Sequence, residues 1–448
     1  MRVLIIGAGN AGRNLATKLC EEKRDVVLID RDPDALAEVQ AQLDILTVEG
    51  EGSSPVVLEK AEVRKADLVV AVTDSDEANI LACVIAHAAG VPHKVARVSN
   101  RDFLTAPEQL NLERVGIDLV VSQKEECANE LLNILRMPGT LESVDLLDGK
   151  VLAVGIRVHM DSPLLRSPLR TFPNQEILRF IRFIAVVRGS ELIVPRGDTE
   201  FLVGDDAYFV GRREDVARFL DWAWPERAMA DKVVIAGGGD LGLRLAQLLE
   251  GTDKESVLIE LDEERAHDCS ELLDRTLVIK GDALDRETLE NAGVSKAAFV
   301  ATTHDDENNI IACLLAEKMG ARFTLAEINK PEYVPIVDEL SLLDRAVSPP
   351  LSMINAILHF VRGKYVKEAA LFHRLPGELM DLVVPAKSKW AGNAVKDIKM
   401  PIGIVLAGIL RNDEVLVPTG DLVVLAGDRV AIFAAPQVVG KLESIFRR

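Results

Sequence analysis

The sequence predicts an α/β protein in which one architectural plan occurs twice along a chain of 448 residues. Two closely similar openings, MRVLIIGAGNAGRNLATKL and DKVVIAGGGDLGLRLAQLL, begin the two copies. In each copy short apolar segments alternate with amphipathic ones, which is typical of a doubly wound parallel sheet. A β-rich segment with Gly-Asp turns then follows, and it predicts a small α+β domain after each sheet.

The two copies stay in register over long stretches. Placing Gly237 on Gly7 sets TDSDEANILACVIAHAAG opposite THDDENNIIACLLAEKMG and sets Asp30 opposite Glu260. A steady offset of this kind is the signature of an internal repeat. The pairing continues where VPRGDTEFLVGDDAYF matches VPTGDLVVLAGDRVAIF. We therefore infer that both kinds of domain are duplicated.

Changes in sequence composition set the expected domain limits, with AWPERAMAD as the central linker. A longer amphipathic segment follows each predicted sheet, at residues 123–136 and 350–362. We expect each segment to be a helix that either acts as a hinge between lobes or subunits or belongs to an ordinary core. The expected limits are 1–138 and 139–222 for the first N-domain and C-domain, 223–230 for the linker, and 231–364 and 365–448 for the second pair.

The first half carries a GxGxxG pattern, Gly7, Gly9 and Gly12, directly after RVLII and before an amphipathic segment. In this setting the first glycine makes the turn, the second admits phosphates to the backbone, and the third allows close packing of helix on strand. Asp30 ends the next strand, where a carboxylate binds ribose hydroxyls and repels a 2′-phosphate. We predict a Rossmann-like domain that binds NAD(H) or an adenine nucleotide rather than NADP(H).

The second half keeps the same pattern in GGGDLG and Glu260, although a duplicated sheet could retain its glycines for packing alone. One difference between the halves is informative, since Arg97 falls opposite Glu327 at the end of a later strand. A guanidinium there can reach phosphates, whereas a carboxylate repels them. We expect the halves to bind different nucleotides, or the second half to bind more weakly.

Charge and composition exclude several classes of partner. The formal net charge of −19 disfavours nucleic acid and anionic lipid. The apolar runs are too short to cross a bilayer, and the N-terminus passes directly into a strand, so we expect a cytoplasmic protein without direct membrane insertion. The 5 cysteines include no CxxC pair and indicate a reducing compartment. His267 with Cys269 is too weak a pattern to predict a metal site.

A dehydrogenase needs a proton-handling side chain that faces the nicotinamide. His159 and His373 are isolated and typical of structural histidines, and the sequence has no Walker A motif. Two nucleotide sites without catalytic residues favour a protein that senses nucleotides over an enzyme. An NAD-dependent oxidoreductase is the alternative interpretation, and a small-molecule-binding repressor without a DNA-binding segment is a third.

The order of GAGNAG, VVLID, TDSDEAN, ARVSN and VPRGD, repeated with THDDENN and VPTGD, resembles the regulator-of-K⁺-conductance (RCK) family over essentially the whole chain. The resemblance implies a cytosolic regulatory subunit of a membrane-embedded Trk-type potassium transporter (TrkH or TrkG), held at the inner face of the membrane through that partner. It also implies a homotetramer that forms a gating ring and changes shape on binding NAD(H), ATP or ADP.

The resemblance further implies the binding residues. Those of the first half are Gly7, Gly9, Asn10 and Gly12 for the phosphates, Asp30 for the ribose, Arg31 beside the adenosine, Thr73 and Asp74 at the next strand end, and Arg97 on a phosphate. Those of the second half are Gly237, Gly239, Asp240, Gly242, Glu260, Thr303 and His304. The second half departs from the first in having Glu327 for Arg97 and His304 for Asp74.

Overall fold

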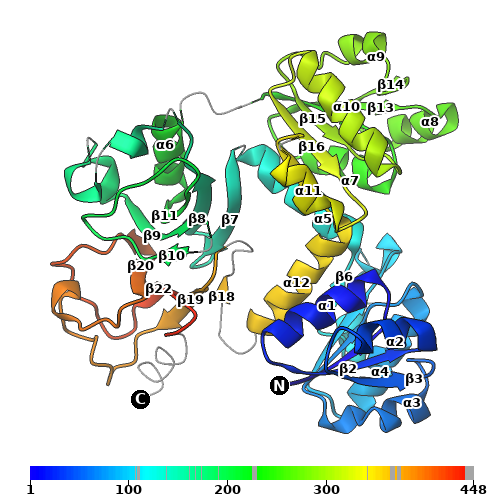
Figure 1. The fold of residues 1–448 in the computed structure, drawn as a ribbon, viewed down its shortest axis with the longest axis horizontal. Helices are drawn as coiled ribbons and strands as arrows, with labels where there is room; N and C mark the ends of the chain where they lie inside the picture. The colour runs from blue at the N-terminus through cyan, green and yellow to red at the C-terminus, as the bar shows by residue number, and fades with distance from the viewer. Residues whose placement is uncertain are drawn as a thin grey trace. The chain divides into compact units, whose positions relative to one another are not determined.

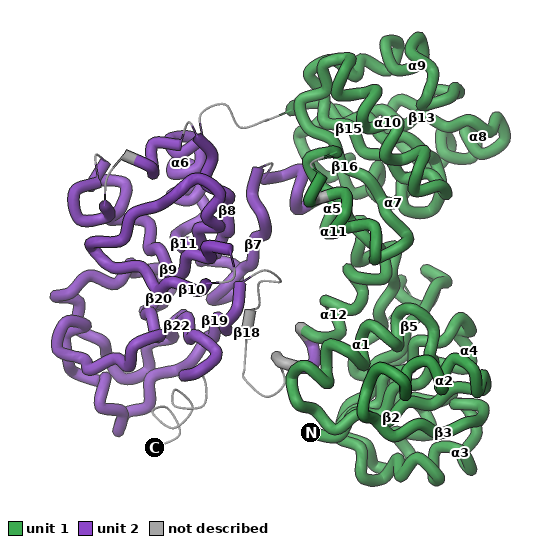
Figure 2. Tube along the Cα trace, in the orientation of Figure 1, with its two compact units in different colours: residues 1–132, 230–358 green, residues 133–229, 359–448 purple. Residues whose placement is uncertain are grey.

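The chain folds into two compact units (Figure 2), which are Met1–Leu132 with Ala230–Leu358, and Asn133–Met229 with His359–Arg448. The first unit combines the large domains of both halves, and the second combines the small ones. The computed structural model describes residues 1–105, 107, 111–137, 139–160, 162–166, 168–172, 174–189, 191–224, 230–340, 342–363, 369–370 and 375–438.

The first half begins with a six-stranded sheet of order β3-β2-β1-β4-β5-β6, in which all neighbouring strands are parallel. This is the strand order of a doubly wound dinucleotide-binding sheet. Figure 1 shows this domain in blue and cyan, with β2, β3 and β6 labelled. Its strands are β1 (Arg2–Ile6), β2 (Asp25–Asp30), β3 (Leu46–Glu49), β4 (Leu68–Ala71), β5 (His93–Arg97) and β6 (Leu119–Val121). Its helices are α1 (Asn10–Glu21), α2 (Pro33–Gln40), α3 (Pro55–Lys60), α4 (Asp76–Ala88) and α5 (Gln123–Arg136).

The second half repeats this sheet in the order β14-β13-β12-β15-β16-β17, again with parallel neighbours. Its strands are β12 (Lys232–Ala236), β13 (Glu255–Glu260), β14 (Leu277–Lys280), β15 (Ala298–Ala301), β16 (Phe323–Glu327) and β17 (Arg345–Val347). Its helices are α7 (Asp240–Glu250), α8 (Glu263–Leu272), α9 (Arg286–Asn291), α10 (Asp306–Lys318), α11 (Tyr333–Glu339) and α12 (Pro349–Gly363).

Apolar side chains cover both faces of these sheets, as expected for parallel strands. On one face of the first sheet, Leu4 and Ile6 of β1 pack in one buried cluster with Leu58 of α3 and Ala82 and Cys83 of α4. The second sheet has an equivalent cluster, which includes Val234 and Ala236 of β12 and Cys313 of α10. The predicted pair of Rossmann-like sheets is therefore confirmed.

The second unit contains two five-stranded antiparallel sheets, of order β10-β9-β11-β8-β7 and β18-β19-β22-β20-β21. The first consists of β7 (Thr140–Leu146), β8 (Val151–Arg157), β9 (Ile181–Arg188), β10 (Glu191–Ile193) and β11 (Asp206–Arg212), followed by α6 (Arg213–Ala223). The second consists of β18 (Ala369–Ala370), β19 (Glu378–Val383), β20 (Ile404–Arg411), β21 (Glu414–Leu416) and β22 (Arg429–Ala434).

The two small sheets share one apolar core. Ala153 and Tyr208 of the first sheet belong to the same buried cluster as Leu379, Ala407 and Phe433 of the second. Polar contacts join them as well, since Arg212 donates to the Val415 carbonyl at 2.8 Å and Arg429 pairs with Asp148. The small domains are thus duplicated, as predicted, and the repeats pack on each other.

The division between the two units can be compared with the predicted domain limits. The division between the two units lies inside α5 and inside α12, the two helices predicted at 123–136 and 350–362. The predicted domain limits remain a prediction. His373, residues 225–229 of the linker and most of the closing segment QVVGKLESIF lie outside the described residues.

Each small domain contains the same ion pair, between a partly exposed arginine and a buried aspartate, beside its Gly-Asp turn. Arg411 donates to both carboxylate oxygens of Asp428, at 2.8 and 2.7 Å, and also to the Val423 carbonyl. Arg188 and Asp205 make the equivalent pair at 2.8 Å. Burial opposes the ionisation of Asp428, but the guanidinium of Arg411 offsets it and holds the pKa of that carboxyl below its usual value. The ion pair fixes the turn to its strand.

Replacing Asp428 by Asn is expected to lower the free energy of unfolding by about 3 kcal/mol, because it leaves a largely buried guanidinium without its counter-ion. Urea unfolding at neutral pH measures this loss. The matched control is Asp421→Asn in the preceding Gly-Asp turn, since the Asp421 side chain is 88% exposed and its pairing with Lys396 contributes little.

The free energy of unfolding that Asp428→Asn removes should decrease at acidic pH. The folded-state pKa of Asp428 is depressed, so its stabilisation is complete above the unfolded-state value of about 3.9. The difference between wild type and Asp428→Asn should therefore shrink as the pH falls through the lower folded-state pKa. A difference that grew on acidification would contradict this assignment.

Candidate nucleotide-binding sites

A glycine-rich turn joins β1 to α1 in the first half. Gly7 has a φ of 109°, which non-glycine residues rarely adopt, and its N–H donates to the Ile29 carbonyl of β2 at 2.8 Å. Gly9 is the N-cap of α1, and a β-carbon there would meet no atom within 4 Å. At Gly12 a β-carbon would lie 1.8 Å from the Gly7 carbonyl oxygen. Gly9 thus leaves open space above the helix N-terminus, whereas Gly12 is required for packing.

The turn between β12 and α7 repeats this geometry closely. Gly237 has a φ of 106°, and Gly239 is the N-cap of α7, where a β-carbon would again meet no atom within 4 Å. A β-carbon on Gly242 would lie 1.9 Å from the Gly237 carbonyl oxygen. The N–H groups at both helix N-termini are suited to bind phosphate. The two glycine motifs therefore serve packing and leave room for a ligand at once.

A carboxylate at the end of the second strand closes each turn. Asp30 accepts hydrogen bonds from the N–H of Ala8 at 2.5 Å and from that of Asp32 at 2.9 Å. Glu260 accepts from Gly238 at 2.5 Å and from Asp262 at 2.9 Å. Both side chains are half-buried. A carboxylate held in this way keeps lone pairs for the two hydroxyls of a ribose.

The far side of each site is fixed by a fully buried asparagine. Asn79 of α4 accepts from the Thr73 N–H at 2.9 Å and from its hydroxyl at 2.7 Å, and it donates to the carbonyls of Thr73 and Arg97. Asn309 of α10 makes the same four bonds to Thr303 and Glu327. Neither asparagine was among the predicted site residues, although an Asn at one register position in both apolar helices was a usable signal.

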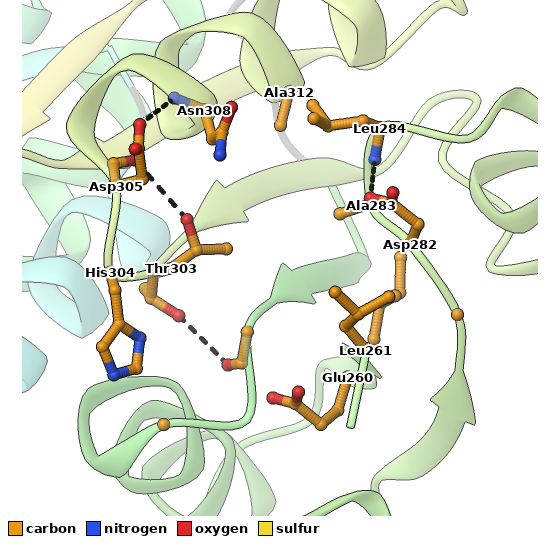
Figure 3. Close-up of a pocket in the computed structure, with 15 residues that line it drawn as sticks. Glu260, Leu261, Asp282, Ala283, Leu284, Thr303, His304, Asp305, Asn308 and Ala312 are labelled. Atoms are coloured by element: carbon orange, nitrogen blue, oxygen red, sulfur yellow. Dashed lines mark hydrogen bonds between the residues drawn. The ribbon is translucent and has the colours of Figure 1, made fainter. Parts of the chain in front are cut away.

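The structure describes a cavity of about 300 Å³ in the second half, at the carboxyl ends of β12, β13 and β15 (Figure 3). Figure 3 shows Thr303 and His304 on one side of it and Asp282 to Leu284 on the other, with Glu260 and Leu261 below. This is the point where the strand order reverses, which is where doubly wound sheets bind ligands. Of the predicted residues, the structure brings Gly237, Gly239, Glu260, Thr303 and His304 together around this cavity.

The remaining predicted residues of the second half lie at the edge of the cavity or behind it. Asp240 is the first residue of α7 and pairs with Lys124 at 2.5 Å and with Arg265 at 3.5 Å. The hydrogen bond from Lys124 holds the pKa of Asp240 below its usual value. Gly242 lies behind the cavity, against the Gly237 carbonyl. Asp240 thus places a negative charge at the helix N-terminus.

In the first half, Arg97 ends β5, as predicted, and its guanidinium donates to Asp74 at 2.9 Å. The Arg97 side chain is mostly buried, whereas Asp74 is 98% exposed. Asn10 and Arg31 are exposed at the start of α1 and just after β2. Arg97 therefore stands at the predicted strand end, paired with a carboxylate that is almost fully exposed.

Glu327 differs from what we expected of it. It ends β16 as predicted, but it is buried and lies outside the residues that line the cavity. Burial raises its pKa to about 7, and the positive charge of Lys124 acts in the opposite direction. Near neutral pH this carboxyl is therefore partly uncharged, so its repulsion of a phosphate is weaker than its sequence position implied.

The weak metal pattern of the second half does not form a site. His267 is exposed and lies 3.5 Å from Glu271, whereas Cys269 is buried and donates to the Gly238 carbonyl. Burial raises the pKa of the Cys269 thiol. Within the described ranges, no three His, Cys, Asp or Glu side chains gather in an arrangement that could hold a metal ion.

Family comparisons agree with the tandem architecture. The TrkA-N domain family matches residues 3–123 and 233–349, and the TrkA-C domain family matches residues 153–223 and 379–447. The Trk system potassium uptake protein TrkA of Halomonas elongata is 34% identical over 442 residues, which cover 97% of this chain and 95% of that protein.

Solved structures match the fold over the whole chain. The crystal structure of the GsuK RCK domain has a TM-score of 0.61 at 20% identity and covers 100% of this chain and 95% of that one. The GsuK channel bound to NAD has a TM-score of 0.62 at 20% identity, covering 100% of this chain and 79% of that one. In the part of the chain that the structure describes, no helix combines the length and apolar character needed to span a membrane.

Substituting the glycines of the first turn should separate packing from binding. Gly12→Ala is expected to destabilise the protein by more than about 3 kcal/mol, because its methyl group would overlap the Gly7 carbonyl oxygen. Gly9→Ala should leave thermal unfolding unchanged and weaken nucleotide binding, because its methyl group enters the open space above the helix N-terminus. Differential scanning fluorimetry and calorimetric titration test the pair, and equal effects of the two substitutions on unfolding would contradict the division.

Proposed function

This chain belongs to the TrkA family of tandem RCK proteins, and from that premise we propose that it is the nucleotide-binding regulatory subunit of a Trk-type potassium uptake transporter. The observation that carries the proposal is the duplicated turn in which a strand-end carboxylate, Asp30 or Glu260, closes a glycine-rich helix N-terminus. In this proposal, nucleotide binding at these turns changes the activity of the transporter.

The ligand of this proposal is NAD(H) or an adenine nucleotide such as ATP or ADP. The strand-end carboxylates suit unmodified ribose hydroxyls and repel a 2′-phosphate. The similarly folded GsuK channel was solved bound to NAD, which supports a nucleotide of this class. The alternative of an NAD-dependent oxidoreductase is set aside, because the relatives are named for potassium uptake and not for a redox reaction.

The proposed regulation is a linkage between ligand binding and the shape of an assembly. We take the assembly to be a homotetramer that forms a ring on the cytoplasmic face of a TrkH or TrkG type transporter. A ligand that binds one ring shape more tightly shifts the equilibrium by RT ln α per site, where α is the ratio of affinities. Four sites with roughly tenfold preference each would supply about 5.5 kcal/mol.

Deleting both ribose carboxylates tests the function directly. In cells that depend on Trk uptake, the double variant Asp30→Ala, Glu260→Ala should still co-purify with the transporter, while potassium uptake should lose its response to nucleotide. Asp25→Ala with Glu255→Ala, at the opposite ends of the same two strands, is the matched control and should respond normally. Substrate-dependent NADH consumption by the purified chain would overturn the proposal.

Asp30→Ala alone should weaken NADH and ATP binding at the first site by roughly 10- to 150-fold, because it removes charge-assisted hydrogen bonds worth about 1.5–3 kcal/mol. Calorimetric titration of the full chain in the Glu260→Ala background isolates this site. Binding that is unchanged for both ligands would show that Asp30 does not hold the ribose.

Arg97→Glu should weaken ATP binding at the first site more than NADH binding, because the guanidinium is a forked donor for a terminal phosphate. Calorimetric titration in the Glu260→Ala background, at two salt concentrations, measures both affinities. The ATP affinity of the unaltered first site should fall more steeply with salt than that of the Arg97→Glu variant. Equal losses for both ligands would make Arg97 a structural residue of the β5 end.

A further inference from the structure

A lysine from the first half of the chain lies beside the glycine-rich turn of the second half. Lys124 is the second residue of α5, which belongs to the first half, and its ammonium lies 2.5 Å from Asp240 at the start of α7. Asp240 directly follows Gly239, which lines the cavity. The Lys124 side chain is 54% exposed. Lys124 and Asp240 do not line the cavity themselves, so the charge of Lys124 stands at its edge, beside the N-terminus of α7.

A second contact holds α5 in this place. Arg244 of α7 donates through Nε to both oxygens of Glu125, at 2.9 and 2.8 Å, and through Nη2 at 2.5 Å. Both side chains are about four-fifths buried, with exposed fractions of 22% and 21%. Bidentate pairs of this kind fix orientation as well as distance. The N-terminal turn of α5 is thus anchored beside the glycine-rich turn of the second half.

The equivalent residues of the other junction cannot form these contacts. Aligning the starts of α5 and α12 places Pro350 opposite Lys124 and Leu351 opposite Glu125. The first glycine-rich turn has Asn10 where the second has Asp240, and Asn14 where it has Arg244. The first site has its own cation instead, in Arg97. Each site therefore has a nearby cation that the other lacks, which is Arg97 of β5 in the first and Lys124 in the second. Arg265 also lies 3.5 Å from Asp240, but its Nε already donates to the Gly238 carbonyl.

We propose that Lys124 is the phosphate-binding cation of the second nucleotide site. It takes the role proposed for Arg97 in the first site, because the second half has Glu327 at the position of Arg97. In this structure Asp240 holds the ammonium in place. The diphosphate group of a nucleotide bound over the N-terminus of α7 competes with Asp240 for the Lys124 ammonium. Binding at the second site thereby acts on α5, so the first half senses the ligand of the second. This inference rests on the proposed nucleotide-binding function.

The test compares ligands with and without phosphate on the full chain. In the Asp30→Ala background, where binding at the first site is weakened, Lys124→Gln should weaken ADP binding at the second site about tenfold or more. Adenosine, which has no phosphate, should bind equally to both proteins. Lys124→Arg should retain most of the ADP affinity. Calorimetric titration at low and moderate salt measures all three, and the salt dependence of ADP binding should also decrease in Lys124→Gln.

Lys18→Gln is the matched control, because it removes the same charge from a comparably exposed lysine, 57%, on α1. It should leave ADP binding in the Asp30→Ala background unchanged. In the Glu260→Ala background, which leaves only the first site, Lys124→Gln should also have no effect.

Two outcomes would overturn the inference, and they are distinguishable. If Asp30→Ala binds ADP normally and Lys124→Gln changes nothing, the assignment of Lys124 is wrong while the proposed function stands. If Asp30→Ala binds neither ADP nor NADH, the second site is not a nucleotide site, and that part of the proposed function fails with it.

Discussion

The buried carboxamide of Asn79, and its counterpart in Asn309, holds together the part of each sheet that carries the candidate binding site. Each side chain makes four hydrogen bonds, three to the threonine just after the fourth strand and one to the carbonyl at the end of the fifth. An amide that is fully satisfied in an apolar interior is stabilising, whereas an unsatisfied one is costly. These bonds join the two strand ends to the helix between them in the same arrangement in both halves.

A rigid frame of this kind allows charges at the rim to vary without altering the backbone. Asp76 and Asp306 show how closely the frame is repeated, since each accepts hydrogen bonds from the N–H groups of two consecutive residues just beyond the fifth strand. Around it, Arg97 and Glu327 differ in charge, as do Asn10 and Asp240. The two halves therefore differ in electrostatics while sharing one geometry.

Features that depend on local sequence were predictable. The glycine turns, the carboxylates at the ends of β2 and β13 and the alternation of strands and helices follow from short-range sterics and periodicity. Duplication strengthened these predictions, because each feature occurred twice at one offset.

Features that depend on distant packing were not predictable. Lys124 has the sequence context of an ordinary surface lysine, and its position beside Asp240 exists only once α5 packs on the other half. The burial of Glu327 is of the same kind, since its strand-end position was clear but its surroundings were not. The common core of the small domains joins residues far apart in the chain, such as Tyr208 and Phe433, and no local pattern signals it.

That common core has a consequence for how the protein is made on the ribosome. The inner face of the first small sheet, including Tyr208, emerges during translation well before Phe433 and the rest of its partner have been synthesised. At elongation rates of about 5–20 residues per second, this apolar face stays uncovered for roughly 11 to 45 seconds. Joining the repeats in one polypeptide ensures that the cover arrives from the same nascent chain, at the high effective concentration that a covalent link provides. A separately synthesised half would instead have to find its partner by diffusion.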